Sequence, residues 1–231
     1  MKPEFIYFDL DNTLLDHTSA EAEAQKVTYR QYTELQKVSM EEWLRTYAEI
    51  NHALWQKYQM DDIDREELQL ARFRDSMLKL RMDPSQSGEI GVAYMGHYRN
   101  YWNWIDGARQ AIEKVSGRIG TGIITNGFRE TQQKKYEVLE LNRYCSQFLI
   151  SEDVGKMKPH PEVFDRATEM AGVTRESILY VGDSYSSDIV GGRNAGWKTA
   201  WYTAFSTTTP ERESADFRFG SFDQLLTWLR I

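Results

Sequence analysis

Short apolar runs alternate with amphipathic segments along most of the chain. Runs that are typical of buried strands lie at 5–8, 119–125, 147–151, 178–183 and 197–203. Most segments between the later runs have helical periodicity, and a last helix is predicted at about 222–229. Strands that alternate with helices form parallel sheets with helices on both faces, because each crossover returns over the sheet. The pattern therefore predicts an α/β fold in three layers.

The stretch at 17–104, after the first apolar run, has helical periodicity only. Residue pairs with capping-box or related spacing precede the predicted helices, namely Thr18 with Glu21, Ser39 with Glu42 and Asp64 with Glu67. The apolar residues that step by three or four positions are Trp43, Tyr47, Ile50, Leu54 and Tyr58, then Leu70, Phe73, Met77 and Leu80, and, after Asp83 and Pro84, Ile90, Tyr94, Tyr98 and Tyr101. We expect an all-helical subdomain at 17–104, inserted into a core formed by 1–16 and 105–231. The polar stretch 206–216 is predicted to be a mobile surface loop.

Composition narrows the classes of partner. The net charge of −7 argues against nucleic acid or an anionic membrane as the main partner. Cys145 is the single cysteine, so the chain cannot form an internal disulfide or a cysteine-based zinc site. No signal-peptide pattern is present and no apolar run approaches the roughly 20 residues of a membrane span, so we expect a cytoplasmic protein. The oligomeric state stays open.

Two carboxylates follow the first apolar run. In an extended chain, Asp9 and Asp11 point to the same side, because side chains alternate along a strand. Two like charges so placed repel each other unless a cation or a shared proton relieves the repulsion. The pair therefore indicates a functional site rather than a packed core.

Other polar residues follow the second and fourth apolar runs. Thr125, Asn126 and Gly127 come after the second, and Asp183 and Asp188 come after the fourth. Because the carboxyl ends of parallel strands meet at one edge of a sheet, we expect these groups to converge with Asp9 and Asp11.

The segments FDLDNT, IITNG, GKMKP and GDSYSSD, in that order, resemble the four motifs of the haloacid dehalogenase superfamily of phosphotransferases. The resemblance extends over nearly the whole chain and implies a Rossmann-like core. It also implies that 17–104 is a cap of type one, a subdomain that closes over the active site and recognises the leaving group of the substrate.

The resemblance assigns roles to the motif residues. Asp9 is expected to be the nucleophile that forms an aspartyl-phosphate, and Asp11 to protonate the leaving oxygen and then deprotonate water. Lys158 supplies a fixed positive charge. The residues expected to hold phosphoryl oxygens are Thr125, Asn126 and Gly127. The residues expected to hold Mg²⁺ are Asp9, Asp11 through its carbonyl, Asp183 and, through water, Asp188.

Parts of the predicted cap resemble one branch of this superfamily. NHALWQKYQ (51–59) and ELQLARF (67–73) are similar to segments of the pyrimidine and noncanonical nucleotide 5′-phosphatases. Most cap aromatics fall at core spacing and are interpreted as packing residues. Trp55 is the exception that we assign to substrate binding.

These observations favour a Mg²⁺-dependent phosphomonoester hydrolase that acts on nucleoside 5′-monophosphates. A carboxyl group at Asp11 favours phosphate esters as substrates, because the dehalogenases and phosphonatases of the superfamily lack an acid there. The alternatives are a phosphatase of sugar phosphates or small phospho-acids such as phosphoglycolate, a mutase, and a non-catalytic phosphate-binding module.

Overall fold

The computed structural model describes residues 2–206 and 215–231. It divides into two compact units, a core unit of 1–16 and 103–231 and a helical unit of 17–102. The polar stretch that we predicted as a loop lies largely outside the described residues. Its last residue, Asp216, is described and accepts a hydrogen bond from the backbone N–H of Thr199 over 2.9 Å.

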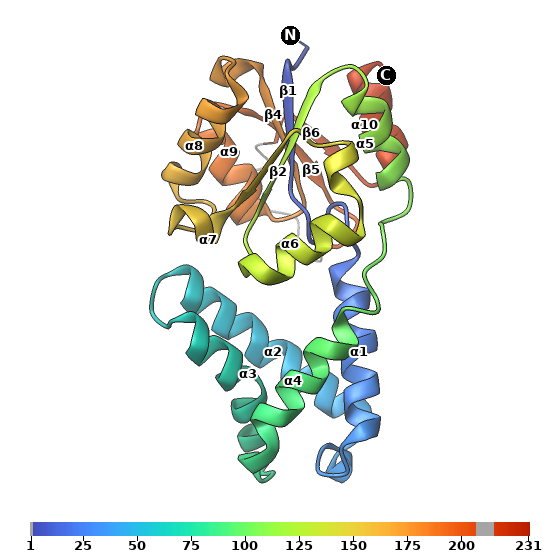
Figure 1. Cartoon of the computed structure of the whole chain (residues 1–231), viewed down its shortest axis with the longest axis vertical. Helices are drawn as coiled ribbons and strands as arrows, with labels where there is room; N and C mark the ends of the chain where they lie inside the picture. Colours follow the sequence, from blue (N-terminus) through green and yellow to red (C-terminus); the bar gives the residue numbers. More distant parts are fainter. Residues whose placement is uncertain (1, 207–214) are drawn as a thin grey trace. The chain divides into compact units, whose positions relative to one another are not determined.

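A six-stranded sheet forms the middle layer of the core unit (Figure 1). The strands lie in the order β3-β2-β1-β4-β5-β6, and every pairing is parallel. Their bounds are β1 (Phe5–Phe8), β2 (Gly120–Thr125), β3 (Gln147–Ile150), β4 (Ile178–Gly182), β5 (Lys198–Tyr202) and β6 (Phe217–Phe219). β1 therefore lies between β2 and β4, the position at which the order of strands reverses and at which such sheets bind ligands.

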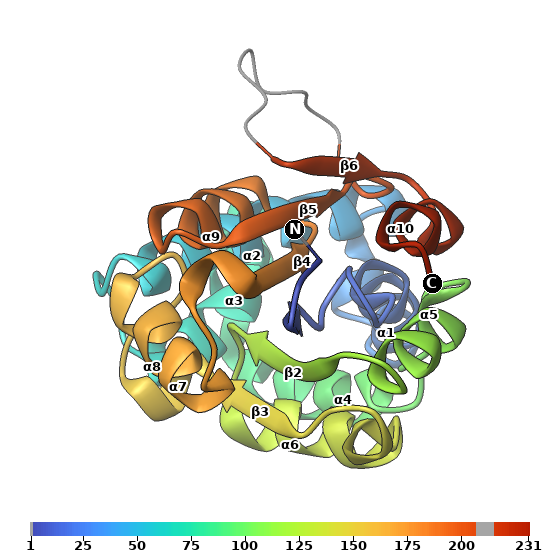
Figure 2. The same cartoon turned by 90° about the horizontal axis from the view of Figure 1, so that it is seen from above.

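Helices cover both faces of the sheet (Figure 2). They are α5 (Ala108–Ser116), α6 (Arg129–Val138), α7 (Ser151–Val154), α8 (Pro161–Ala171), α9 (Val190–Asn194) and α10 (Phe222–Leu229). α8 and α9 lie over one face, and α5 and α10 lie over the other. Phe164 of α8 packs in one hydrophobic cluster with Tyr7 of β1 and Tyr180 of β4. The predicted three-layer α/β fold is confirmed.

The helical unit consists of α1 (His17–Gln31), α2 (Met40–Gln59), α3 (Arg65–Lys79) and α4 (Ser87–Tyr98). Ser39 and Asp64 cap α2 and α3 as their spacing predicts, each accepting a hydrogen bond from the backbone N–H three residues later. An aromatic core holds the helices together, with Phe73 5.0 Å from Tyr47 and 5.4 Å from Tyr94 between ring centroids. Burial of such rings stabilises the unit, because large aromatic side chains remove much apolar surface from water.

Several details of the sequence prediction are wrong. Thr18 is no N-cap, because α1 already begins at His17. Leu70 is 55% exposed, because the inward positions of α3 include Arg72, a charged residue that an apolar pattern does not count. Tyr101 lies beyond α4, whose end at Tyr98 is followed by tight turns.

Strand β6 was not predicted either. Its three residues are too few for an alternation to be detected, and Arg218 interrupts the apolar run. Within the described residues, no helix is both long and apolar enough to cross a lipid bilayer.

Candidate active site

Asp9 comes directly after the central strand β1. Its backbone N–H donates to the carbonyl of Val181 on β4 over 2.8 Å, which continues the sheet ladder to the carboxylate. The neighbouring strands β2 and β4 end at Thr125 and Gly182, and Asp183 follows at once. The sheet therefore brings polar groups from three strand ends to one edge.

The side chain of Asp9 forms a buried ion pair. Oδ1 of Asp9 accepts a hydrogen bond from Nζ of Lys158 over 2.7 Å, and both residues are buried. Burial raises the pKa of Asp9 to about 7, against the opposing effect of Lys158 and with a further increase from Asp188 and Asp11. The environment thus disfavours a charged Asp9 unless more positive charge is present.

Lys158 is held by several groups at once. Its Nζ also donates to Oδ1 of Asp188 over 2.8 Å and to the hydroxyl of Tyr180 over 2.6 Å, and it lies 3.1 Å from the carbonyl of Ile124. Burial alone would lower the pKa of Lys158, but the carboxylates of Asp188 and Asp9 outweigh it and raise the pKa above its ordinary value. The ammonium is therefore charged and fixed in place.

Three carboxylates meet beside this lysine. Oxygens of Asp9, Asp183 and Asp188 lie within 4.8 Å of one another. Burial raises the pKa of Asp183 well above its usual range, and the charges of Asp9 and Asp188 add to the increase. Lys158 offsets only one of the three formal negative charges. A carboxylate cluster with excess negative charge fits a hard divalent cation such as Mg²⁺.

Asp188 contacts the protein through both of its oxygens. Oδ1 accepts from Lys158, and Oδ2 accepts from the backbone N–H of Ser184 over 3.0 Å. A side chain at Gly182 would collide with this carboxylate, since a Cβ there would lie 2.3 Å from Oδ2. Asp188 lies in a π-helical turn, Tyr185–Ile189, where it contacts Lys158 and remains within reach of the carboxylates of Asp9 and Asp183.

Thr125 and Asn126, two residues of the second motif, have different surroundings. Thr125 is buried at the end of β2, while Asn126 uses its side chain to hold the loop that carries Lys158. Oδ1 of Asn126 accepts from the backbone N–H of Lys158 over 2.8 Å, and Nδ2 donates to the carbonyl of the same residue over 2.9 Å. The sequence did not suggest this bracing role for the Asn126 side chain.

Comparison with known proteins identifies the family to which the chain belongs. The profile of the family described as haloacid dehalogenase-like hydrolase matches residues 6–202. The chain belongs to this family of hydrolases. The resemblance seen in the four motifs is thereby confirmed, and the protein is an enzyme of the haloacid dehalogenase type.

Two characterised relatives of the hydrolase have different substrates in their names. Pyrimidine 5′-nucleotidase YjjG of Escherichia coli is 33% identical, with 97% of each chain covered. Glyceraldehyde 3-phosphate phosphatase of Pyrococcus furiosus is 30% identical, with 96% of this chain and 90% of that one covered. Among solved structures, the putative HAD-hydrolase YfnB of Bacillus subtilis, bound to magnesium, is 26% identical with a TM-score of 0.87 over 100% of both chains.

Two residues of the hydrolase that contact Asp11 were missed by the sequence analysis. Nζ of Lys135 lies 2.6 Å and 2.8 Å from the two oxygens of Asp11, and Nε2 of Gln132 donates to Oδ2 over 2.8 Å. Both come from α6. In sequence they belong to a polar QQKK run, which is typical of a solvent-exposed helix face. The available signal was their spacing of three positions in the helix after the second motif, which places them on one face.

Trp55, the predicted substrate contact in the helical unit of the hydrolase, is partly exposed on α2. Its ring packs edge-on against Tyr58 with centroids 5.8 Å apart. In the same unit, the nucleotidase-like segments contribute Asn51 and Arg72, and both side chains are buried. Nδ2 of Asn51 donates to Glu21 of α1 over 3.0 Å.

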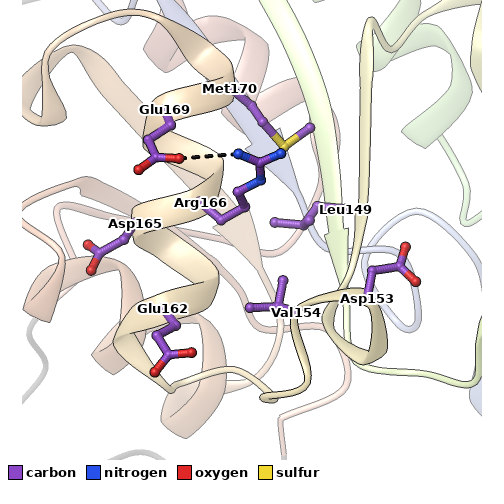
Figure 3. A pocket seen from close by; sticks show the side chains of 8 residues that line it. All are labelled: Leu149, Asp153, Val154, Glu162, Asp165, Arg166, Glu169 and Met170. Atoms are coloured by element: carbon purple, nitrogen blue, oxygen red, sulfur yellow. Dashed lines mark hydrogen bonds and ion pairs between the residues drawn. The ribbon is translucent and has the colours of Figure 1, made fainter.

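A hollow of about 610 Å³ lies between α7 and α8 of the core unit (Figure 3). Its lining residues are Leu149, Asp153, Val154, Glu162, Asp165, Arg166, Glu169 and Met170. Arginines pair with most of the acids, as Arg166 does with Glu169 over 3.2 Å and Arg175 with Asp165 over 2.8 Å. These ion pairs are largely exposed and contribute little, so the lining of the hollow differs from the buried charged groups beside β1.

Proposed function

We propose that this hydrolase is a Mg²⁺-dependent phosphatase that cleaves phosphate monoesters through an aspartyl-phosphate on Asp9, with nucleoside 5′-monophosphates as its substrates. The observation that carries the proposal is the Asp9 carboxylate, which is buried 2.7 Å from the fixed ammonium of Lys158 and has Asp11 two residues later. A nucleophile, a charge to neutralise phosphate and an acid are the groups that this chemistry needs.

In the first half of the reaction, an oxygen of Asp9 attacks phosphorus and the bond to the leaving oxygen breaks. Asp11 gives its proton to that oxygen, which leaves as an alcohol. In the second half, Asp11 takes a proton from water, whose oxygen attacks the phosphorus of the aspartyl-phosphate. Inorganic phosphate leaves, and the Asp9 carboxylate is regenerated.

The residues that would hold Mg²⁺ are Asp9, the carbonyl of Asp11 and Asp183, with Asp188 behind them. When bound, the ion would neutralise the charge that repels a carboxylate from a phosphate dianion. Lys158 would supply a positive charge, and the Thr125 hydroxyl a neutral hydrogen-bond donor, to the phosphoryl oxygens.

The nucleotide assignment is supported by the 33% identical pyrimidine 5′-nucleotidase and by the two nucleotidase-like segments of the helical unit. A sugar or triose phosphate is the second candidate, because a glyceraldehyde 3-phosphate phosphatase is 30% identical over most of both chains. In either case, the helical unit is the part of the chain that we expect to contact the leaving group, with Trp55 among its contacts.

Phosphate release from a panel of nucleotides and sugar phosphates, with Mg²⁺ and after EDTA treatment, tests the proposal. We expect turnover only with the metal, and a higher kcat/KM for uridine 5′-monophosphate than for ribose 5-phosphate, since a nucleotidase uses binding energy from the base. Asp9→Asn should abolish turnover while retaining the fold. Full activity of that variant would refute the assignment of Asp9 as the nucleophile. A preference for ribose 5-phosphate would favour a sugar or triose phosphate as the substrate.

A further inference from the structure

Helix α6 carries two polar side chains that are almost fully buried. Gln132 is 1% exposed and Lys135 is 2% exposed. Lysine is rarely buried to this extent unless a partner compensates its charge. The two residues are three positions apart, so they lie on the same face of the helix. That face points to Asp11.

The two side chains hold both oxygens of the Asp11 carboxylate. Lys135 contacts Oδ1 over 2.6 Å and Oδ2 over 2.8 Å, and Gln132 donates to Oδ2 over 2.8 Å. Charge-assisted hydrogen bonds of this length are strong and directional. They fix the carboxylate in one orientation.

Gln132 also connects Asp11 to the end of β2. Its Nε2 donates a second hydrogen bond to Oγ1 of Thr125 over 2.9 Å. Because a carboxylate only accepts hydrogen bonds, the NH₂ end of the amide must face Asp11. Thr125 then accepts from Gln132, which leaves the hydroxyl hydrogen of Thr125 to be donated to a phosphoryl oxygen.

Gly127 provides the room for this arrangement. A Cβ at position 127 would lie 2.1 Å from Nε2 of Gln132, so any larger residue would displace the amide. The glycine of the second motif thus has a role in placing Gln132, in addition to the contact with phosphoryl oxygens that the sequence predicts.

We propose that Lys135 and Gln132 are positioning residues that hold the Asp11 side chain and the Thr125 hydroxyl in a fixed mutual orientation. Asp11, an ion-paired carboxylate in the free protein, takes up a proton when the phosphate ester binds and gives it to the leaving oxygen. This inference rests on the phosphatase function proposed above. Neither residue exchanges a proton with the substrate; each acts through Asp11 or Thr125. General acid catalysis contributes about 10²–10⁴-fold and depends on placement, so its loss is measurable.

The test compares two leaving groups. Uridine 5′-monophosphate releases a poor leaving group that needs a proton, whereas p-nitrophenyl phosphate releases a stable phenolate that does not. For Lys135→Met, we expect kcat/KM to fall at least about 30-fold with the nucleotide and less than about 3-fold with the aryl ester. Lys134→Met is the matched control, because Lys134 is exposed on the same helix and pairs with Glu137 over 3.2 Å. It should leave both values unchanged.

A double-mutant cycle separates positioning from general damage to the fold. In an Asp11→Asn background, Lys135→Met should cause no further loss, because the acid on which Lys135 acts is already absent. Lys135→Arg, which keeps the charge, should recover part of the nucleotide activity. Gln132→Met, a neutral change of similar size, should show the same selectivity for the leaving group and so covers the case in which the lysine variant fails to fold.

Equal losses with both esters, or additive losses with Asp11→Asn, would overturn the inference while leaving the proposed function intact. A wild-type protein that releases phosphate from neither ester would instead overturn the proposed function and the inference together.

Discussion

The ammonium of Lys158 lies 2.7 Å from Oδ1 of Asp9, although 149 positions separate the two residues in the sequence. Asp9 follows the central strand, and Lys158 lies in the loop between α7 and α8. The same ammonium contacts Asp188, so one lysine joins two of the three clustered carboxylates. Anything that shifts Lys158 changes the charge balance of the whole cluster.

Tyr180→Phe should weaken this arrangement without removing a charge. The Tyr180 hydroxyl accepts from Lys158 over 2.6 Å and donates to the carbonyl of Ile124 over 3.0 Å. We expect a decrease of about 1–3 kcal/mol in the free energy of unfolding, because buried polar groups lose a partner. We also expect a fall in kcat of about 3–30-fold. Urea denaturation and steady-state kinetics measure the two effects, and a kcat equal to that of wild type would contradict a role for Tyr180 in activity through Lys158 and Asp9.

Asp9→Asn should stabilise the metal-free protein at high pH. Burial raises the pKa of Asp9 from 3.8 to about 7, so the folded state binds this proton more tightly than the unfolded state. The resulting stabilisation is complete below about pH 4 and is lost as the pH rises through about 7. Asparagine carries no charge to bury, so the variant should gain stability relative to wild type at pH 8 and little at pH 4.

Urea denaturation of EDTA-treated protein at both pH values measures this difference. Adding Mg²⁺ at pH 8 should stabilise the wild type more than the variant, because the ion binds the folded state through Asp9. An Asn variant with the same relative stability at both pH values would show that Asp9 is ionised in the metal-free fold.

Arg72→Met should destabilise the helical unit. The guanidinium of Arg72 lies 5.6 Å and 5.3 Å from the ring centroids of Phe73 and Tyr94, and it is buried. Methionine fills part of the volume but removes the cation–π contacts, so we expect a loss of about 1–3 kcal/mol in urea denaturation. Arg74→Met is the control on the same helix, because Arg74 is partly exposed and its ion pairs contribute at most about 1 kcal/mol. Equal losses for the two variants would contradict the role of the buried site.

The strands and the positions that follow them could be predicted because they depend on local patterns. An apolar run followed by Asp9 predicts both a buried strand and the group at its carboxyl end. Because the carboxyl ends of parallel strands lie at one edge of the sheet, the groups that follow the strands are predicted to lie close together. The same rule placed Thr125 and Asp183 at the edge that holds Asp9. For these residues, the structure that the local sequence pattern predicts is the structure found in the folded protein.

The burial of several polar side chains could not be predicted in this way. Lys135 and Arg72 are buried cations, whereas charged residues in helices are normally assigned to the solvent face. Their burial depends on a compensating group elsewhere in the chain, Asp11 for Lys135 and the aromatic rings for Arg72. Tyr180 was counted only as part of an apolar strand, because its hydroxyl has a function only once Lys158 lies beside it.

The placement of Asp9 after β1 also affects how the hydrolase loses activity. All four residues of β1 are buried, and the strand is paired on both sides, with the N–H of Asp9 bonded to Val181. Amides in such a strand exchange their hydrogens with solvent only when the whole domain opens. Fraying at the outer strands β3 and β6 therefore leaves Asp9 where it is, and thermal inactivation should follow global unfolding of the core rather than local melting around the Asp9 carboxylate.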